Sequence, residues 1–145
     1  MNKEYIKLGD YKSFDYEIPN IFLDFIIEEE RVLVKTELKL IKNNIKTNII
    51  SLDGIDIRVE KIYVDGTLLE KKLYSIQKSR LLIKSILNET FTINIEGSIK
   101  PKENVSLIGM YESNGIITTQ CEAEGFRRIS YHSDRPDILS KYKVR

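Results

Sequence analysis

The sequence has very few of the residues that build disulfides and metal centres. Among 145 residues there is one cysteine, Cys121, and one histidine, His132. An internal disulfide and a site with several histidine ligands are therefore both excluded within this chain. The H-E-x-x-H motif, which places two histidines around zinc on one helix, is absent as well. A single cysteine is typical of proteins in reducing compartments, and we expect a cytoplasmic protein.

An excess of charge of one sign is also lacking. The chain has 23 Lys and Arg against 22 Asp and Glu, a formal net charge of +1. Because proteins that bind nucleic acid need a basic excess or stripe, we expect no nucleic-acid partner. No apolar run approaches the roughly 20 residues of a membrane span, and residues 1–5 lack the apolar centre of a signal peptide. We therefore expect no association with a membrane.

What the sequence does contain is material for β-strands. Residues 32–40 alternate between apolar or threonine side chains and charged ones, which predicts a strand with one face exposed to water. Residues 21–27 precede them as a second strand, so the two runs predict an antiparallel hairpin. Shorter runs predict further strands at 49–52, 55–59, 73–77, 81–85, 91–95, 107–111 and 116–119, and the tail at 142–145 resembles the beginning of another.

Turn signals separate these runs. Asp65-Gly66 is the strongest of them, because this pair suits the type I′ turn of a hairpin. No long amphipathic helix, repeat or linker is present. The pattern predicts an all-β fold, either an antiparallel, strongly twisted sheet or a β-sandwich, formed by residues 1–145 as one domain.

The stretch 115–131 differs from ordinary strand sequence. Its apolar run ends in Gln120, Cys121 and Glu122, and Glu124-Gly125 follows. On a continued strand, Gln120, Glu122 and Glu124 would lie on the same side and form a patch of acceptors suited to a primary ammonium group. In the alternative interpretation, the carboxylates pair with the nearby arginines and only hold a loop. Those arginines are Arg127, Arg128 and Arg135.

Two other chemistries are weaker hypotheses. Cys121 and His132 are the only possible pair of nucleophile and base, but neither lies in a nucleophile motif, and a lone cysteine among strands is more often a core residue. A metal site is the second hypothesis. Its candidate ligands, which lack any recognised ligand spacing, are Cys121, Glu122, Glu124, His132 and Asp134.

Three segments carry a resemblance to a known family. Residues 109–113 (G-M-Y-E-S), 118–131 (T-T-Q-C-E-A-E-G-F-R-R-I-S-Y) and 134–137 (D-R-P-D) closely resemble the N-terminal domain of M1-family zinc aminopeptidases, above all its bacterial aminopeptidase N (alanyl aminopeptidase) branch. The resemblance implies a β-rich saddle packed against a thermolysin-like catalytic domain. It also implies that Gln120 and Glu122, from the family's T-Q-x-E segment, hold the α-ammonium of the peptide substrate, whereas Glu124 is not a main ligand.

In that family the zinc motif and the G-A-M-E-N substrate motif lie on the catalytic domain, and this sequence contains neither. We therefore expect a domain truncated at its C-terminal end, without a catalytic domain, zinc or activity of its own. Zinc would belong to the full-length enzyme, with ligands outside this chain. The expected partners are the peptide N-terminus and the enzyme's own catalytic domain, and exposed sheet surface would favour self-association. The alternative is a stand-alone, non-catalytic β-sandwich that serves as an interaction module.

Overall fold

The structure is a computed structural model that describes residues 7–145. The segment 1–5, for which we expected no signal peptide, lies outside the described residues. The largest sheet has the order β11 (Lys141–Val144), β1 (Tyr16–Ile27), β2 (Val32–Lys42), β8 (Thr90–Ile99), β4 (Arg58–Val64) and β5 (Thr67–Leu68). A second sheet contains β3 (Ile49–Asp53), β7 (Arg80–Lys84) and β6 (Tyr74–Ile76), and a third pairs β9 (Gly109–Ser113) with β10 (Ile116–Gln120). Short 3₁₀ helices are η1 (Leu8–Asp10), η2 (Lys71–Leu73), η3 (Pro101–Glu103) and η4 (Phe126–Arg128).

The predicted hairpin of the first two strands is confirmed. β1 and β2 pair antiparallel, with Ile27 opposite Val32 at the turn. Along β2 Val32, Val34, Leu38 and Leu40 are buried, whereas Lys35, Glu37 and Lys39 are exposed. One face of the large sheet therefore faces the core and the other faces water, as strand alternation requires.

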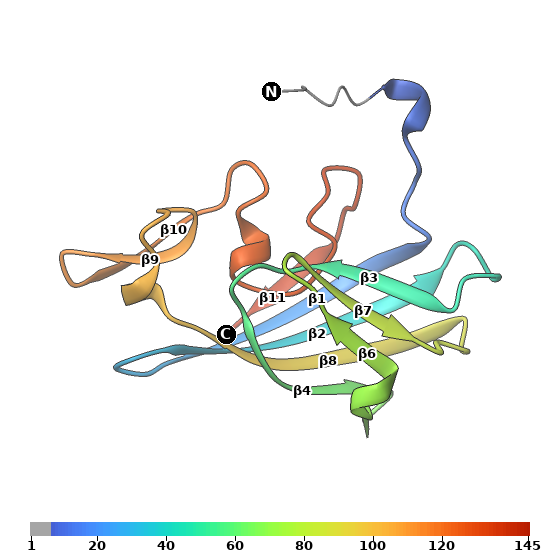
Figure 1. The fold of residues 1–145 in the computed structure, drawn as a ribbon, viewed down its shortest axis with the longest axis horizontal. Coiled ribbons are helices and arrows are strands. Elements are labelled where there is room, and N and C mark those ends of the chain that lie inside the picture. The colour runs from blue at the N-terminus through green and yellow to red at the C-terminus, as the bar shows by residue number, and fades with distance from the viewer. Residues whose placement is uncertain (1–6) are drawn as a thin grey trace.

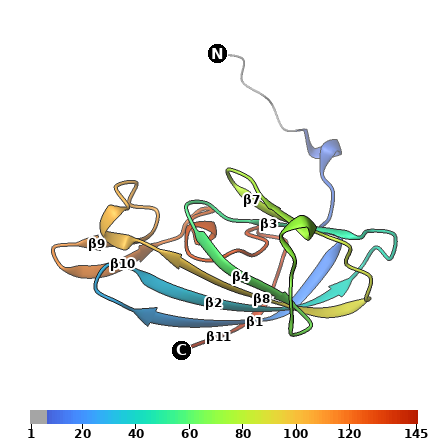
Figure 2. The same ribbon diagram turned by 60° about the horizontal axis from the view of Figure 1, so that its bottom comes forward.

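The core lies between the large sheet and the layer formed by β3, β7 and β6, which crosses over its apolar face (Figure 2). Leu38 and Ile93 from the large sheet and Ile50, Leu52 and Ile83 from the small one are each fully buried in a single cluster. The predicted all-β class is confirmed. Among the residues that the structure describes, no helix is long and apolar enough to cross a membrane.

The predicted turn at Asp65-Gly66 is also confirmed. Both residues have positive φ, 48° and 76°, and they join β4 to β5 as a type I′ turn requires. The prediction of a strand at 55–59 is wrong for residues 55–57, because β4 starts only at Arg58. The N–H of Ile55 donates instead to the carbonyl of Arg127, 2.8 Å away, so a distant segment takes this stretch out of the sheet.

The strand expected at the tail is present as β11. It joins the edge of the large sheet in parallel to β1, behind the other strands in Figure 1. The guanidinium of Arg145 donates two hydrogen bonds to the carboxylate of Asp24, at 3.0 and 2.7 Å. Its backbone also bonds to Leu23 and Phe25. Residues more than a hundred positions apart thus close this edge of the sheet.

Candidate functional site

The β9–β10 hairpin projects from one side of the molecule (Figure 1). The candidate residues lie at the end of this hairpin opposite its turn, where β10 leads back to the body of the protein. Asn114 and Gly115 form its two-residue turn, with φ values of 51° and 77°. Ser113 pairs with Ile116 next to the turn, and Gln120 pairs with Gly109 at the far end. Gln120 is therefore the last strand residue before the chain turns back toward the body of the protein.

The expectation that Gln120, Glu122 and Glu124 share one side of a strand is wrong. β10 ends at Gln120, and Glu122 to Gly125 form a tight turn that is closed by the N–H of Gly125 donating to the carbonyl of Cys121 at 2.8 Å. A Cβ at position 125 would lie 2.7 Å from the Cα of Cys121 and 2.8 Å from the carbonyl oxygen of Gln120. Only glycine fits there, so the chain reverses at this point and the period of two is lost.

This turn is anchored to the body through the segment that follows it. Asp134 accepts hydrogen bonds from the backbone N–H of Arg127 at 3.1 Å and from its Nε at 3.0 Å. The N–H of Asp134 donates in turn to the carboxylate of Asp53, at the end of β3. Because Arg127 and Asp134 are both largely shielded from water, these bonds hold η4 and the turn in a fixed position.

The loop-holding interpretation is correct for one of the two glutamates. Glu124 lies 3.3 Å from the guanidinium of Arg127. Glu122 makes no salt bridge or side-chain hydrogen bond within residues 7–145. The other carboxylates that pair with these arginines are Asp134 with Arg127, Asp56 with Arg128 and Asp137 with Arg135.

Gln120 and Glu122 together present free acceptors to solvent. The side-chain amide of Gln120 donates from Nε2 to the backbone carbonyl of Glu122, at 3.1 Å. This bond orients the amide and leaves its Oε1, like the Glu122 carboxylate, without a partner among the described residues. Both residues are exposed. A primary ammonium group carries three donors and a positive charge, so it is the kind of cation that this pair of acceptors can bind.

The structure gives no support to catalysis by Cys121. Burial raises the pKa of its thiol, which keeps it in the protonated, unreactive form. The ring of His132 is turned to other partners: its Nδ1 lies 3.2 Å from the carbonyl oxygen of Ser130, and it packs edge-on against Phe126. In the part of the chain described by the structure, no three His, Cys, Asp or Glu side chains are grouped to hold a metal.

His132 is instead a buried structural residue, 4% exposed, and no pattern in the sequence predicted this role. Burial lowers its pKa, so the unfolded chain binds a proton that the folded chain does not. Its contribution to stability is therefore present above the unfolded pKa of about 6.5 and is lost as the pH falls below that value.

We expect the free energy of unfolding to decrease from pH 7.5 to pH 5, with a slope of at most about 1.4 kcal/mol per pH unit from this group. Urea unfolding at several pH values measures that slope. His132→Asn keeps a donor near Nδ1 but cannot titrate, so it should flatten the curve in this range. An equal slope in the variant would assign the pH dependence to other groups.

Comparisons with known proteins cover almost the whole chain. A family model described as "Peptidase M1 N-terminal domain" matches residues 16–145. The aminopeptidases N of Caulobacter vibrioides and Escherichia coli are 37% and 32% identical over 97% and 94% of this chain, but the chain spans only 16% and 15% of their lengths.

Solved structures of similar proteins show the same relationship. Aminopeptidase A of Legionella pneumophila, in complex with aspartic acid, superposes with a TM-score of 0.87 at 33% identity, over 96% of this chain and 17% of that one. An M1 zinc metallopeptidase of Deinococcus radiodurans, at 15% identity, shares the fold with a TM-score of 0.74, over 90% of this chain and 32% of its own. The similarity thus extends over nearly all of this chain and a small part of each relative.

Proposed function

The chain belongs to the peptidase M1 N-terminal domain family, and from this premise we propose that it serves as the N-terminal domain of a zinc aminopeptidase, which removes amino acids from the N-termini of peptides. The proposal is supported by relatives named aminopeptidase N at 32–37% identity. Because the chain spans so little of those relatives, we assign catalysis to a further domain against which this one packs.

Within that enzyme, we assign Gln120 and Glu122 to the binding of the substrate's α-ammonium. The observation that carries this proposal is the unpaired state of Glu122 among the described residues, on a turn whose neighbouring arginines are already neutralised. A carboxylate that the fold itself does not use remains available to a ligand. Glu124, which pairs with Arg127, has no part in the binding.

Such a site lets an exopeptidase select the end of a peptide. A free N-terminus brings an ammonium group that can bond to both acceptors, whereas an internal segment brings none. Once the catalytic domain covers the site, an unsuitable substrate would leave the Glu122 carboxylate buried without a partner, at a cost of about 1–3 kcal/mol or more. The ammonium site thus determines which peptide bond lies at the reaction centre.

The residues present do not fit the zinc ion of the family. The described residues offer no group of three ligand side chains, and the sequence has no H-E-x-x-H motif. We therefore place the zinc on the further domain. What this chain contributes is the position of the substrate amine.

We expect the purified 145-residue chain to hydrolyse no aminoacyl p-nitroanilide and to retain no zinc after dialysis, because its sequence lacks the H-E-x-x-H motif that supplies two zinc ligands and the general base. Release of nitroaniline and metal analysis measure the two properties, with a complete M1 aminopeptidase as the positive control. Stoichiometric zinc together with turnover in the isolated chain would contradict the assignment of zinc binding and catalysis to the further domain.

Sequencing of the source gene beyond the codon for Arg145 tests the proposal at a different level. In-frame G-A-M-E-N and H-E-x-x-H motifs are the expected result. An immediate stop codon would instead favour the stand-alone interaction module, and the acceptors at Gln120 and Glu122 would then need another ligand.

A further inference from the structure

The outer edge of β10 is a free strand edge close to the candidate site. Within residues 7–145, β10 pairs with β9 on one side only, in a sheet of two strands. Ile116 and Ile117 are 67% and 36% exposed. Residues 114–121 contain no charged residue and no proline, the two features by which edge strands usually resist pairing with another chain. This edge is therefore open to a further strand.

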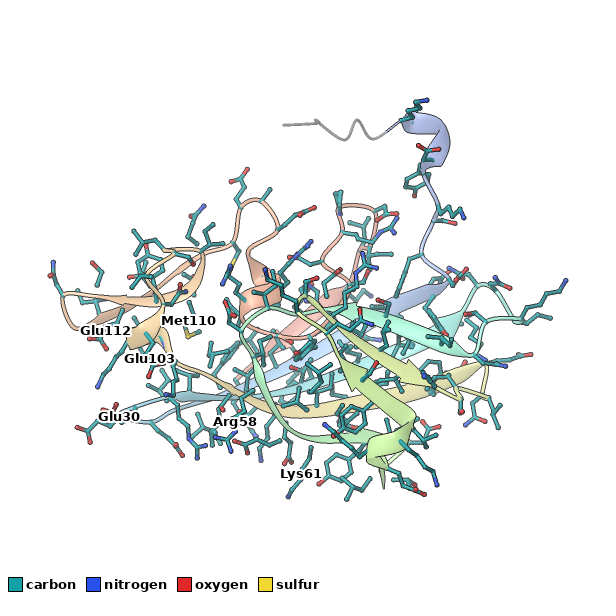
Figure 3. The ribbon with its side chains drawn as sticks, in the orientation of Figure 1. Glu30, Arg58, Lys61, Glu103, Met110 and Glu112 are labelled. Atoms are coloured by element: carbon teal, nitrogen blue, oxygen red, sulfur yellow. The ribbon has the colours of Figure 1, made fainter. Side chains whose placement is uncertain are left out.

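Several other strand edges among the described residues are protected, including one end of β3, where the N–H of Asp53 donates to the carbonyl of His132. β11 carries Lys141 and Lys143, and β5 and β6 have only two and three residues. The outer edge of β9 is covered by the loop around η3, where Asn104 donates from Nδ2 to the carbonyl of Met110 at 2.9 Å. Figure 3 shows Met110 and Glu112 on β9 close to Glu103 of η3. No described residue forms a backbone hydrogen bond to the outer side of β10.

The hairpin register defines which backbone groups β10 offers. Ser113 and Ile116 flank the two-residue turn and form a hydrogen-bonded pair, and such pairs alternate along an antiparallel ladder. The N–H and C=O groups of Ile117 and Thr119 therefore point away from β9. The carbonyl of Met110, opposite Thr119, points outward on the other side, in agreement with its bond from Asn104.

We propose that β10 binds β10 of a second copy of this chain in an antiparallel arrangement, with the two-fold axis at Thr118. Ile117 then lies opposite Thr119 of the second copy, and the four exchanged backbone bonds extend the hairpins into one four-stranded sheet. A two-fold axis places two identical strands side by side, so any charged residue near the axis would face a like charge. Because β10 has no charged residue, this repulsion does not arise. Lysines on β11 would repel each other in the same arrangement.

This contact uses the same edge as the candidate ammonium site. Gln120 lies opposite Ile116 of the second copy, and Glu122 follows directly along the chain. The second copy and a catalytic domain covering the site would therefore compete for one surface. Self-association is independent of the proposed activity, so its test needs no turnover.

Sedimentation velocity of the 145-residue chain across roughly a hundredfold range of concentration tests the contact, because a dimer grows by mass action. The expected result is a shift from monomer to dimer. Thr118→Lys places two lysines across the axis and should prevent the shift. Thr119→Pro removes an outward N–H that β9 does not use, and should weaken association at least about tenfold.

Thr67→Lys is the matched control, since it places the same change on the exposed edge strand β5. It should associate like the wild type, and circular dichroism should show that each variant is folded. A wild-type chain that remains monomeric throughout would overturn the proposal. So would a folded Thr118→Lys variant that dimerises as the wild type does.

Discussion

Replacing Glu122 by glutamine in the enzyme that carries this domain should lower kcat/KM for peptides with a free amino terminus by about tenfold to a hundredfold. The substitution keeps the shape of the side chain and removes the charge that pairs with the ammonium. A hydrogen bond to a charged group contributes about 1.5–3 kcal/mol, which sets this range. Because the Glu122 carboxylate makes no salt bridge or hydrogen bond among the described residues, we expect the stability of the domain to remain unchanged.

Glu124→Gln is the matched control for this experiment. Glu124 lies two residues further along the same turn and carries the same group, but it pairs with Arg127 at the surface. Its loss should leave kcat/KM within about twofold of the wild type, because exposed ion pairs contribute little. Steady-state kinetics on both variants measures the difference. Equal activity of Glu122→Gln and wild type would remove Glu122 from the substrate site.

Gly54→Ala should destabilise the domain by about 1–3 kcal/mol. A Cβ at this position would lie 2.7 Å from Cζ of Tyr131 and still closer to two other ring atoms. Tyr131 is 3% exposed and held in the core, so its ring can move only by disturbing its neighbours. It also lies only three residues after the end of η4, and the displacement would therefore loosen the support of the candidate site.

Urea denaturation followed by circular dichroism measures this effect as a lower midpoint at an unchanged slope. Gly9→Ala provides the control, since no described atom lies within 4 Å of its added Cβ. It should unfold like the wild type. A Gly54→Ala variant as stable as the wild type would show that the ring of Tyr131 moves aside freely.

The sequence predicts those parts of the fold that depend on neighbouring residues. The β1–β2 hairpin follows from alternation along residues 32–40, and the β4–β5 turn follows from Asp65-Gly66. The start of β4 could not be predicted in this way. Ile55 alternates like a strand residue, but its N–H bonds to Arg127, seventy-two positions away. Such long-range bonds leave no periodic signal in the sequence.

The candidate site, too, could be predicted from the sequence only in part. Gln120 and Glu122 could be singled out as acceptors from their residue types, and the family resemblance gave them a role. Their arrangement could not be predicted, because the turn after β10 depends on the packing of Gly125 against Cys121. The same holds for Asp134, whose bonds to Arg127 fix the turn only in the folded chain.

The ammonium site is tested most directly by a cycle of binding measurements on the enzyme that carries this domain. Isothermal titration calorimetry would compare an amino-acid inhibitor with its analogue lacking the α-amino group, against the wild type and against Glu122→Gln. If Glu122 binds the ammonium, removal of the amine should weaken binding to the wild type by more than about tenfold and to the variant far less. Equal losses in the two proteins would show that the ammonium and Glu122 do not interact, and would contradict the proposed function of this domain.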